Sequence, residues 1–323
     1  MIKERTFYYT FVIFIILLSS CNNEKKIPQE ILDIEAEVTI ERFDQAFNNL
    51  NPHTLDSLQG KYSFLFPLQY SQEFWLHKSK DTLQQELKNE IFKVFPNLNS
   101  QKDELELLYK HLKHYYPNIK VPQIISLISE VDYKNRVLLR KELLLISLDC
   151  YLGKNHFFYT DISQYIAKDF EPKSILTDVA NEYAKKIIPR SDGRDFISQM
   201  ILYGKRVYLL KKVLPQKELS EIFNYSKDEL AWNQTNESEI WRYFIEKEIL
   251  YSTDRNLLPR FLYPAPFSKF YMSYDSQSPD RVGQYIGYRI VNSFMKNNNV
   301  SLQQLVEIDS KTIFQKSRFK PKK

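Results

Sequence analysis

Side chains that could bind a metal ion or act as nucleophiles are few and scattered in this 323-residue chain. Of the five histidines, His111 and His114 lie three residues apart, where one helical face could present both to a metal ion. No third ligand follows at a matching spacing, and KHLKHYYP is more typical of the polar edge of an amphipathic helix. The chain also has no CxxC pair, no GxSxG turn and no glycine-rich phosphate loop. These absences argue against dithiol, serine-hydrolase and nucleotide sites.

The clearest chemical signal is Cys21. Lys3 and Arg5 precede a short apolar run, FYYTFVIFIILL, and the sequence turns polar directly after the cysteine. The run is too short to span ~30 Å of hydrocarbon, and its pattern is typical of a secretory signal. The segment Leu-Ser-Ser-Cys resembles the bacterial lipobox, which implies cleavage before an acylated cysteine. We predict a signal peptide over residues 1–20 and a lipid anchor on Cys21. The alternatives are an uncleaved anchor and a secreted protein with a coincidental cysteine.

Composition describes a globular chain without an affinity for nucleic acid. The mature chain would keep 43 of 45 basic and 39 of 40 acidic residues, a formal charge of +4, and it has no basic stripe. With Cys21 acylated, Cys150 has no partner for a disulfide, so the fold must be held by its core. The 22 Tyr and 22 Phe supply that core, and no linker or repeat divides it. We expect a tether over residues 21–31 and a single globular domain over residues 32–323.

Hydrophobic periodicity predicts an α+β fold, predominantly helical, with a small sheet in the first half. The expected strands lie at residues 35–40, 121–128, 137–139 and 143–148. The expected helices lie at residues 41–50, 83–94, 105–115, 175–188, 196–213 and 240–249, with further helices opening at Ser226, Ser278 and Ser301.

Gly283 and Gly287 stand four residues apart in the helical pattern RVGQYIGYRIV. Each glycine inside a helix costs ~1 kcal/mol relative to alanine, so a contact should offset that cost. We predict that another backbone packs closely against this face. Arg281, Gln284 and Arg289 interrupt the run, which argues against a transmembrane GxxxG pair.

Several longer segments are similar to one family. They read IERFDQAF, DTLQQEL, LDCYLG, WRYF, LLPRF, PAPFSKF and RVGQYIG, and begin at residues 40, 81, 148, 241, 257, 264 and 281. Together with the lipobox, they resemble the gliding-motility lipoprotein GldB family of Bacteroidota over nearly the whole chain. The resemblance implies a lipoprotein of the cell envelope, anchored in a membrane, facing the periplasm and required for gliding. It also implies partners among other gliding proteins and the type IX secretion machinery.

A second resemblance is to predicted zinc peptidases with an HExxH helix, a helix carrying a further acidic ligand, and a GxxxGY helix. There the two histidines bind zinc and the glutamate acts as a base. In this chain Asn181 and Lys185 stand at the histidine positions, Tyr203 stands near the acidic position, and Glu182 alone remains. A lysine ammonium has no lone pair for a metal. The resemblance implies a degenerate zincin-like fold, a pseudoenzyme with no metal and no cofactor. The alternative is an unrelated surface helix.

Three functions are compatible with these observations. The favoured one is a non-catalytic scaffold or interaction component of the gliding apparatus. The second is an envelope hydrolase, either metallopeptidase-like or acting on glycans. The third is a lipoprotein that holds a peptide or glycan in the old cleft. Because no complete catalytic set is present, we expect that the protein is not an enzyme.

The lipid anchor is directly testable. Cys21→Ser should leave an uncleaved, unacylated precursor, because the modified thiol is missing. Labelling cells with a fatty-acid analogue measures this. Equal labelling of the wild type and the variant would contradict the lipobox interpretation.

Overall fold

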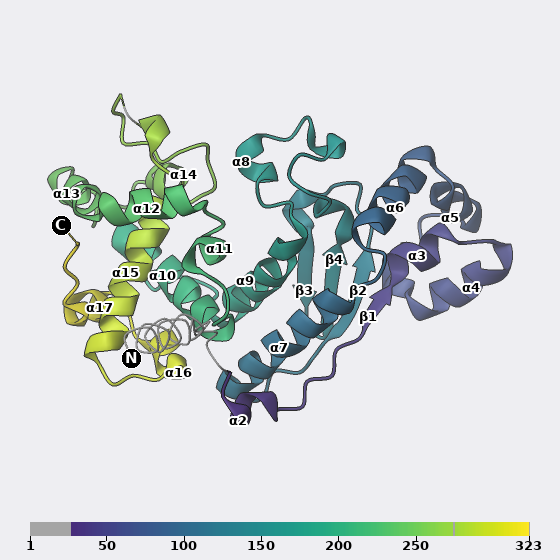
Figure 1. Cartoon of the computed structure of the whole chain (residues 1–323), viewed down its shortest axis with the longest axis horizontal. Helices are drawn as coiled ribbons and strands as arrows, with labels where there is room; N and C mark the ends of the chain where they lie inside the picture. Colours follow the sequence, from purple (N-terminus) through teal and green to yellow (C-terminus); the bar gives the residue numbers. More distant parts are fainter. Residues whose placement is uncertain (1–26, 274, 323) are drawn as a thin grey trace, which may run out of the picture.

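The computed structural model describes residues 27–273 and 275–322, so Cys21 and the predicted signal peptide lie outside the described residues. The described chain is mostly helical, with one four-stranded sheet in its first half (Figure 1). The predicted α+β class is therefore confirmed. No described helix is both long and apolar enough to cross a bilayer.

The sheet is mixed, with strand order β1-β2-β4-β3. Its strands are β1 (Ile40–Arg42), β2 (Gln123–Leu127), β3 (Val137–Arg140) and β4 (Leu143–Ser147). The first three strands in this order are parallel, and β3 pairs antiparallel with β4 through a tight hairpin. The strand predicted at 35–40 is wrong, because only Ile40 pairs with a neighbour. The alternation there comes from Ala36 and Val38, which are buried in the core without any ladder.

Successive residues of β2 face two different cores. Ile124 belongs to the main hydrophobic core and Ile125 to a smaller one, as the period of two along a strand requires. The smaller core is closed by α3 (Phe43–Asn48), α4 (Pro52–Lys61) and α5 (Gln72–Ser79), which form one end of the molecule (Figure 1). The main core lies under α7 (Asn99–Tyr115) and α9 (Ile175–Ile187).

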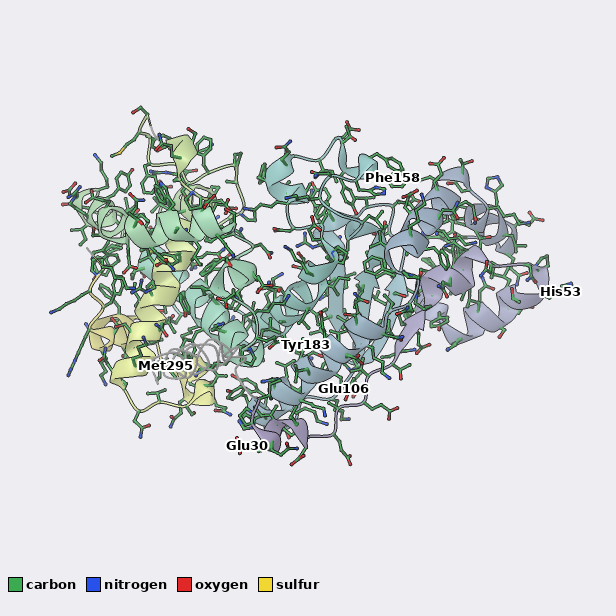
Figure 2. The ribbon with its side chains drawn as sticks, viewed as in Figure 1. Glu30, His53, Glu106, Phe158, Tyr183 and Met295 are labelled. Atoms are coloured by element: carbon green, nitrogen blue, oxygen red, sulfur yellow. The ribbon has the colours of Figure 1, made fainter. Side chains whose placement is uncertain are left out.

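The second half of the chain is organised around α10 (Phe196–Val213), which contacts both α9 and α15 (Val282–Asn297). Tyr183 of α9 lies near the middle of the molecule (Figure 2), where its hydroxyl donates to Tyr109 at 3.2 Å. The remaining helices are α2 (Gln29–Leu32), α6 (Thr82–Val94), α8 (Gln164–Ala167), α11 (Leu219–Phe223), α12 (Lys227–Thr235), α13 (Glu237–Glu246), α14 (Leu257–Phe261), α16 (Leu302–Glu307) and α17 (Ser310–Ser317). Short 3-10 turns connect several of them.

Helix α2 packs against α7 and buries Ile31. Lys110 and Lys113 of α7 donate to the carbonyl oxygens of Leu32 and Glu35, which fixes the chain that follows α2. The chain thus begins to pack against the fold slightly before residue 32. Residue 32 is the position at which the sequence predicts that the globular domain starts.

The backbones of α10 and α15 touch. A Cβ atom on Gly287 would overlap the carbonyl group of Met200, and one on Gly204 would overlap the carbonyl group of Gly287. Gly283 serves a different neighbour, since its Cβ would lie 2.9 Å from a methyl carbon of Leu262 and 3.0 Å from a carbonyl oxygen at the end of α14. The two glycines of one helical face therefore allow close packing of two different segments: α10 against Gly287, and the end of α14 against Gly283.

This contact predicts a large effect of substitution. Gly287→Leu should lower the free energy of unfolding by about 3 kcal/mol or more, because a side chain cannot fit between the two backbones. Gly60→Ala in α4 is the matched control. Nothing lies within 4 Å of its added Cβ, and alanine favours the helix by up to about 1 kcal/mol. Thermal melting followed by circular dichroism measures both, and equal melting of Gly287→Leu and wild type would contradict the contact.

Candidate functional site

A cavity of about 520 Å³ lies where α9, α10 and the start of α15 meet the loop before β3. We call it the central cleft. Asn181, Glu182 and Lys185 line it from α9, and Tyr203 lines it from α10. The structure thus brings together all four residues that the resemblance to zinc peptidases singles out.

Glu182 is engaged by its own helix. Lys185 Nζ donates to Glu182 Oε1 at 2.6 Å, one turn along α9. This is an exposed pair between residues three apart on one helix, which contributes only a few tenths of a kcal/mol to stability. Among residues 27–273 and 275–322, no three His, Cys, Asp or Glu side chains gather as a metal site.

The floor of the central cleft is an ion pair between Arg136, just before β3, and Asp178 of α9. The guanidinium donates twice to the carboxylate, at 2.7 and 3.0 Å, and the hydroxyl of Tyr151 donates to the same carboxylate at 2.8 Å. This bidentate geometry ties α9 to the sheet. Sequence reasoning missed the pair. The sequence does contain one indication of the pair: Asp178 lies on the apolar face of its predicted helix, and a buried carboxylate requires a cation nearby.

A second polar group lies at the start of α15. Arg281 Nε donates to Asp280 at 2.9 Å, but its Nη2 is buried without a hydrogen-bond partner. The backbone of Arg281 is left-handed, with φ of +54°, a conformation that costs a non-glycine residue energy. Across the central cleft, burial raises the pKa of Asp169 to about 6, although the charges of Arg281 and Arg136 act to lower it. Sequence reasoning missed these residues as well.

The histidines of α7 do not form a pair. His111 is buried, its Nδ1 lies 2.9 Å from the Leu107 carbonyl oxygen, and burial lowers its pKa. His114 instead packs edge-on against the ring of Tyr115, with centroids 4.8 Å apart. The polar edge expected for this segment is therefore wrong at His111, which faces the core and whose Nε2 is buried without a hydrogen-bond partner.

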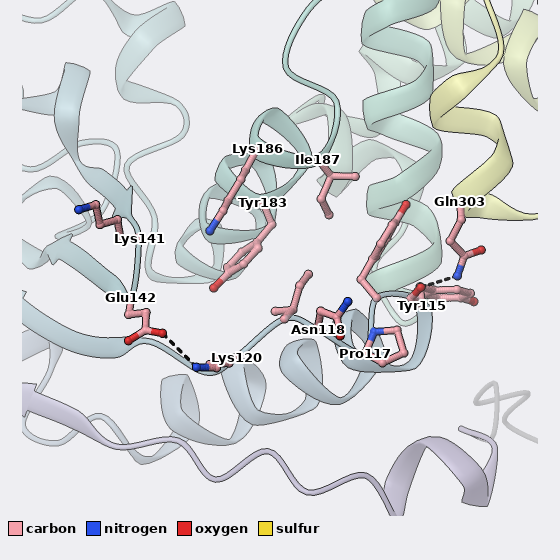
Figure 3. Close-up of a pocket in the computed structure, with 12 residues that line it drawn as sticks. Tyr115, Pro117, Asn118, Lys120, Lys141, Glu142, Tyr183, Lys186, Ile187 and Gln303 are labelled. Atoms are coloured by element: carbon pink, nitrogen blue, oxygen red, sulfur yellow. Dashed lines mark hydrogen bonds and ion pairs between the residues drawn. The ribbon is translucent and has the colours of Figure 1, made fainter.

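A larger cavity, about 670 Å³, opens at the C-terminal end of α7 (Figure 3). Tyr115, Tyr183 and Ile187 give it apolar walls, and Lys120 pairs with Glu142 at its rim at 3.3 Å. None of the four positions from the zinc-peptidase resemblance reaches it. The central cleft is smaller, but it gathers the charged groups and is the stronger candidate for chemistry or binding.

One exposed apolar surface stands out on the segment between α4 and α5 and on the first turn of α5. Phe64 is 50% exposed, Leu68 103%, Tyr70 42% and Phe74 40%. We call these four residues the aromatic surface. The rings of Tyr70 and Phe74 stack with centroids 4.3 Å apart. Phe64 and Leu68 precede this stacked pair by a few residues along the chain, and exposed apolar side chains that gather in one region mark interaction sites more often than isolated ones do.

The cleft floor predicts a stability difference between two acidic residues of one helix. Asp178→Asn should destabilise the fold by about 3 kcal/mol, because it leaves the mostly buried Arg136 without its counter-charge. Glu182→Gln should change stability by less than about 0.5 kcal/mol, because an exposed pair within a helix contributes little. Denaturant titration of both variants measures this. A similar loss of stability in both variants would show that the Arg136–Asp178 ion pair does not stabilise the cleft more than the Glu182–Lys185 pair does.

Comparison with known proteins gives one match. The family model described as gliding motility protein GldB matches residues 24–321. No curated protein and no solved structure matches the chain. The degenerate zincin-like fold therefore stays a prediction, whereas the resemblance to the gliding family is confirmed. The match runs through the sheet, the central cleft and the α10–α15 contact, so the chain belongs to the family of gliding motility protein GldB.

Proposed function

We propose that this protein is a non-catalytic interaction lipoprotein of the gliding apparatus. It is held on a membrane by lipidated Cys21, faces the periplasm, and contacts other gliding proteins near the type IX secretion machinery. The observation that carries this proposal is the aromatic surface, because burying such side chains is the main favourable term in protein association.

The aromatic surface is built on rigid support. Trp75 lies edge-on to both Tyr70 and Phe74, with centroid distances of 5.4 and 5.0 Å. It also meets Phe66 of the smaller core at 5.1 Å. Rings that are already held in place lose little conformational freedom when a partner binds, so less of the binding energy is lost to ordering.

The position of the aromatic surface leaves it free for a partner. Figure 1 places α4 and α5 at one end of the long axis and α2, where the described chain begins, near the middle. The described chain therefore begins away from the aromatic surface. The proposed absence of catalysis is supported by the central cleft, where Lys185, at a position that the resemblance to zinc peptidases assigns to a zinc ligand, pairs with Glu182.

The test separates the aromatic surface from the rest of the molecule. Leu68→Glu combined with Phe64→Ser should abolish colony spreading in a deletion strain, because a charge would be buried in the interface. The matched control is Ile245→Glu combined with Tyr251→Ser, which changes side chains 51% and 70% exposed on the other half. That control should spread normally, and so should Glu182→Gln.

Protein level by immunoblot and fatty-acid labelling must be equal in all strains. Normal spreading of the Leu68/Phe64 variant would contradict the proposal that the aromatic surface binds a partner. Failure of a stable Glu182→Gln strain would instead favour catalysis or ligand binding in the central cleft.

A further inference from the structure

Four tyrosines line the central cleft with hydroxyl groups that the protein leaves unused. Tyr133 comes from the turn before β3, Tyr165 from α8, Tyr203 from α10 and Tyr263 from the loop after α14. In residues 27–273 and 275–322, none of these four hydroxyls has a hydrogen-bond partner. Burial and the neighbouring Tyr263 raise the pKa of Tyr203, so these two side chains lie close together. The four tyrosines can therefore offer both a ring and a hydroxyl to a ligand.

Three planar polar side chains of the central cleft are also unpaired. Asn181 lies on α9, Asn224 directly follows α11, and Asp169 lies two residues after α8. All three are half-buried, no group in the described parts of the chain hydrogen-bonds to their side chains, and none of their polar atoms is sealed from solvent. Burial raises the pKa of Asp169 to about 6, because the ionised carboxylate loses water without gaining a donor. A ligand that supplies donors would replace that water.

The open groups favour a ligand without net charge. The other charges of the central cleft include the pairs Arg136–Asp178 and Lys185–Glu182, which are satisfied within the protein. An anionic ligand would bring its charge toward the open carboxylate of Asp169, which repels it. A cationic ligand would lie among five Lys and Arg side chains, against three Asp and Glu side chains. A neutral ligand with many hydrogen-bonding groups avoids both repulsions.

A sugar matches these groups better than a peptide does. Each sugar hydroxyl both donates and accepts, as the tyrosine hydroxyls and the asparagine amides do. Neighbouring hydroxyls of one sugar ring can donate to the two oxygens of Asp169, whereas successive N–H groups of an extended peptide point to opposite sides. The C–H face of a sugar ring also packs on the face of an aromatic ring, which carries partial negative charge.

We propose that the central cleft binds a neutral oligosaccharide. Its hydroxyls bond to Asp169, Asn181 and Asn224, and its rings pack on the tyrosines that surround them. A volume of about 520 Å³ accommodates about two or three sugar rings and is within the usual range for small-molecule sites. The site shares no residue with the aromatic surface, so either proposal can fail without the other.

Isothermal titration calorimetry with neutral trisaccharides tests the proposal. The protein is the whole mature chain, residues 21–323, with Cys21→Ser to keep it soluble. The probes are maltotriose, cellotriose, mannotriose and chitotriose, and at least one of them should bind at millimolar concentration or below. Trigalacturonate, which carries a carboxylate on every ring, and tetra-alanine, a neutral peptide, should both bind more weakly than that sugar.

Two substitutions locate the binding. Asp169→Ala should raise the Kd about tenfold, because it removes hydrogen bonds to a charged acceptor. It should not lower the melting temperature, because no hydrogen bond among the described residues is lost. Tyr165→Ala should raise the Kd about fivefold, whereas Tyr165→Phe keeps the ring and should have a smaller effect. The matched controls, Asp161→Ala and Tyr251→Ala, change exposed residues outside the central cleft and should leave the Kd unchanged.

Failure of all four neutral trisaccharides to bind would overturn the proposal. Tighter binding of tetra-alanine would reject the sugar in favour of a peptide, and tighter binding of trigalacturonate would contradict the preference for a neutral ligand. An unchanged Kd in both Asp169→Ala and Tyr165→Ala would place the binding outside the central cleft and would also overturn the proposal. Melting curves show whether each variant is folded, and Asp169→Ala alone decides if Tyr165→Ala is not.

Discussion

The close contact between α10 and α15 is the constraint on which the second half of the protein depends. Gly204 and Gly287 remove the side chains that would separate the two helices, so one backbone lies directly on the other. Tyr203 precedes Gly204 by one residue, and Arg281 lies less than two helical turns before Gly287. The contact that packs the core therefore also sets the distance between two walls of the central cleft.

The opposite wall is set by a different interaction. The bidentate pair between Arg136 and Asp178 joins the edge of the sheet to α9, and α9 carries Asn181, Glu182 and Lys185 into the central cleft. A bidentate guanidinium–carboxylate pair fixes orientation as well as distance. Helix packing on one side and an ion pair on the other thus hold two walls of a polar cleft in place.

Local patterns predicted much of this structure. The helical class, three of four strands and the helices α9 and α10 follow from periodicity. The resemblance to zinc peptidases, and not periodicity, singled out the four residues that the structure places on one cleft. Alternation failed at residues 35–40, because Ala36 and Val38 bury themselves without a neighbouring strand. Periodicity reports burial, whereas a strand also requires a hydrogen-bonding partner.

Residues that meet only in three dimensions could not be found in this way. Arg136, Asp169 and Arg281 lie far apart in the chain, and only Arg281 belongs to a motif, RVGQYIG, which does not indicate that it lines a cleft. The aromatic surface was hidden for the opposite reason, since Phe64 and Leu68 look like core residues in sequence. Only the structure shows that the smaller core is already filled by Phe66 and its neighbours, which leaves Leu68 fully exposed.

The central claim is that the aromatic surface is where this protein meets another protein of the gliding apparatus. A photo-crosslinking amino acid at position 68 in living cells tests it most directly, with position 245 as the control. The account predicts a discrete adduct with a gliding or secretion envelope protein from position 68, lost when Phe64→Ser is added, and none from position 245. No adduct from position 68 in a strain that glides normally, or the same adducts from both positions, would contradict it.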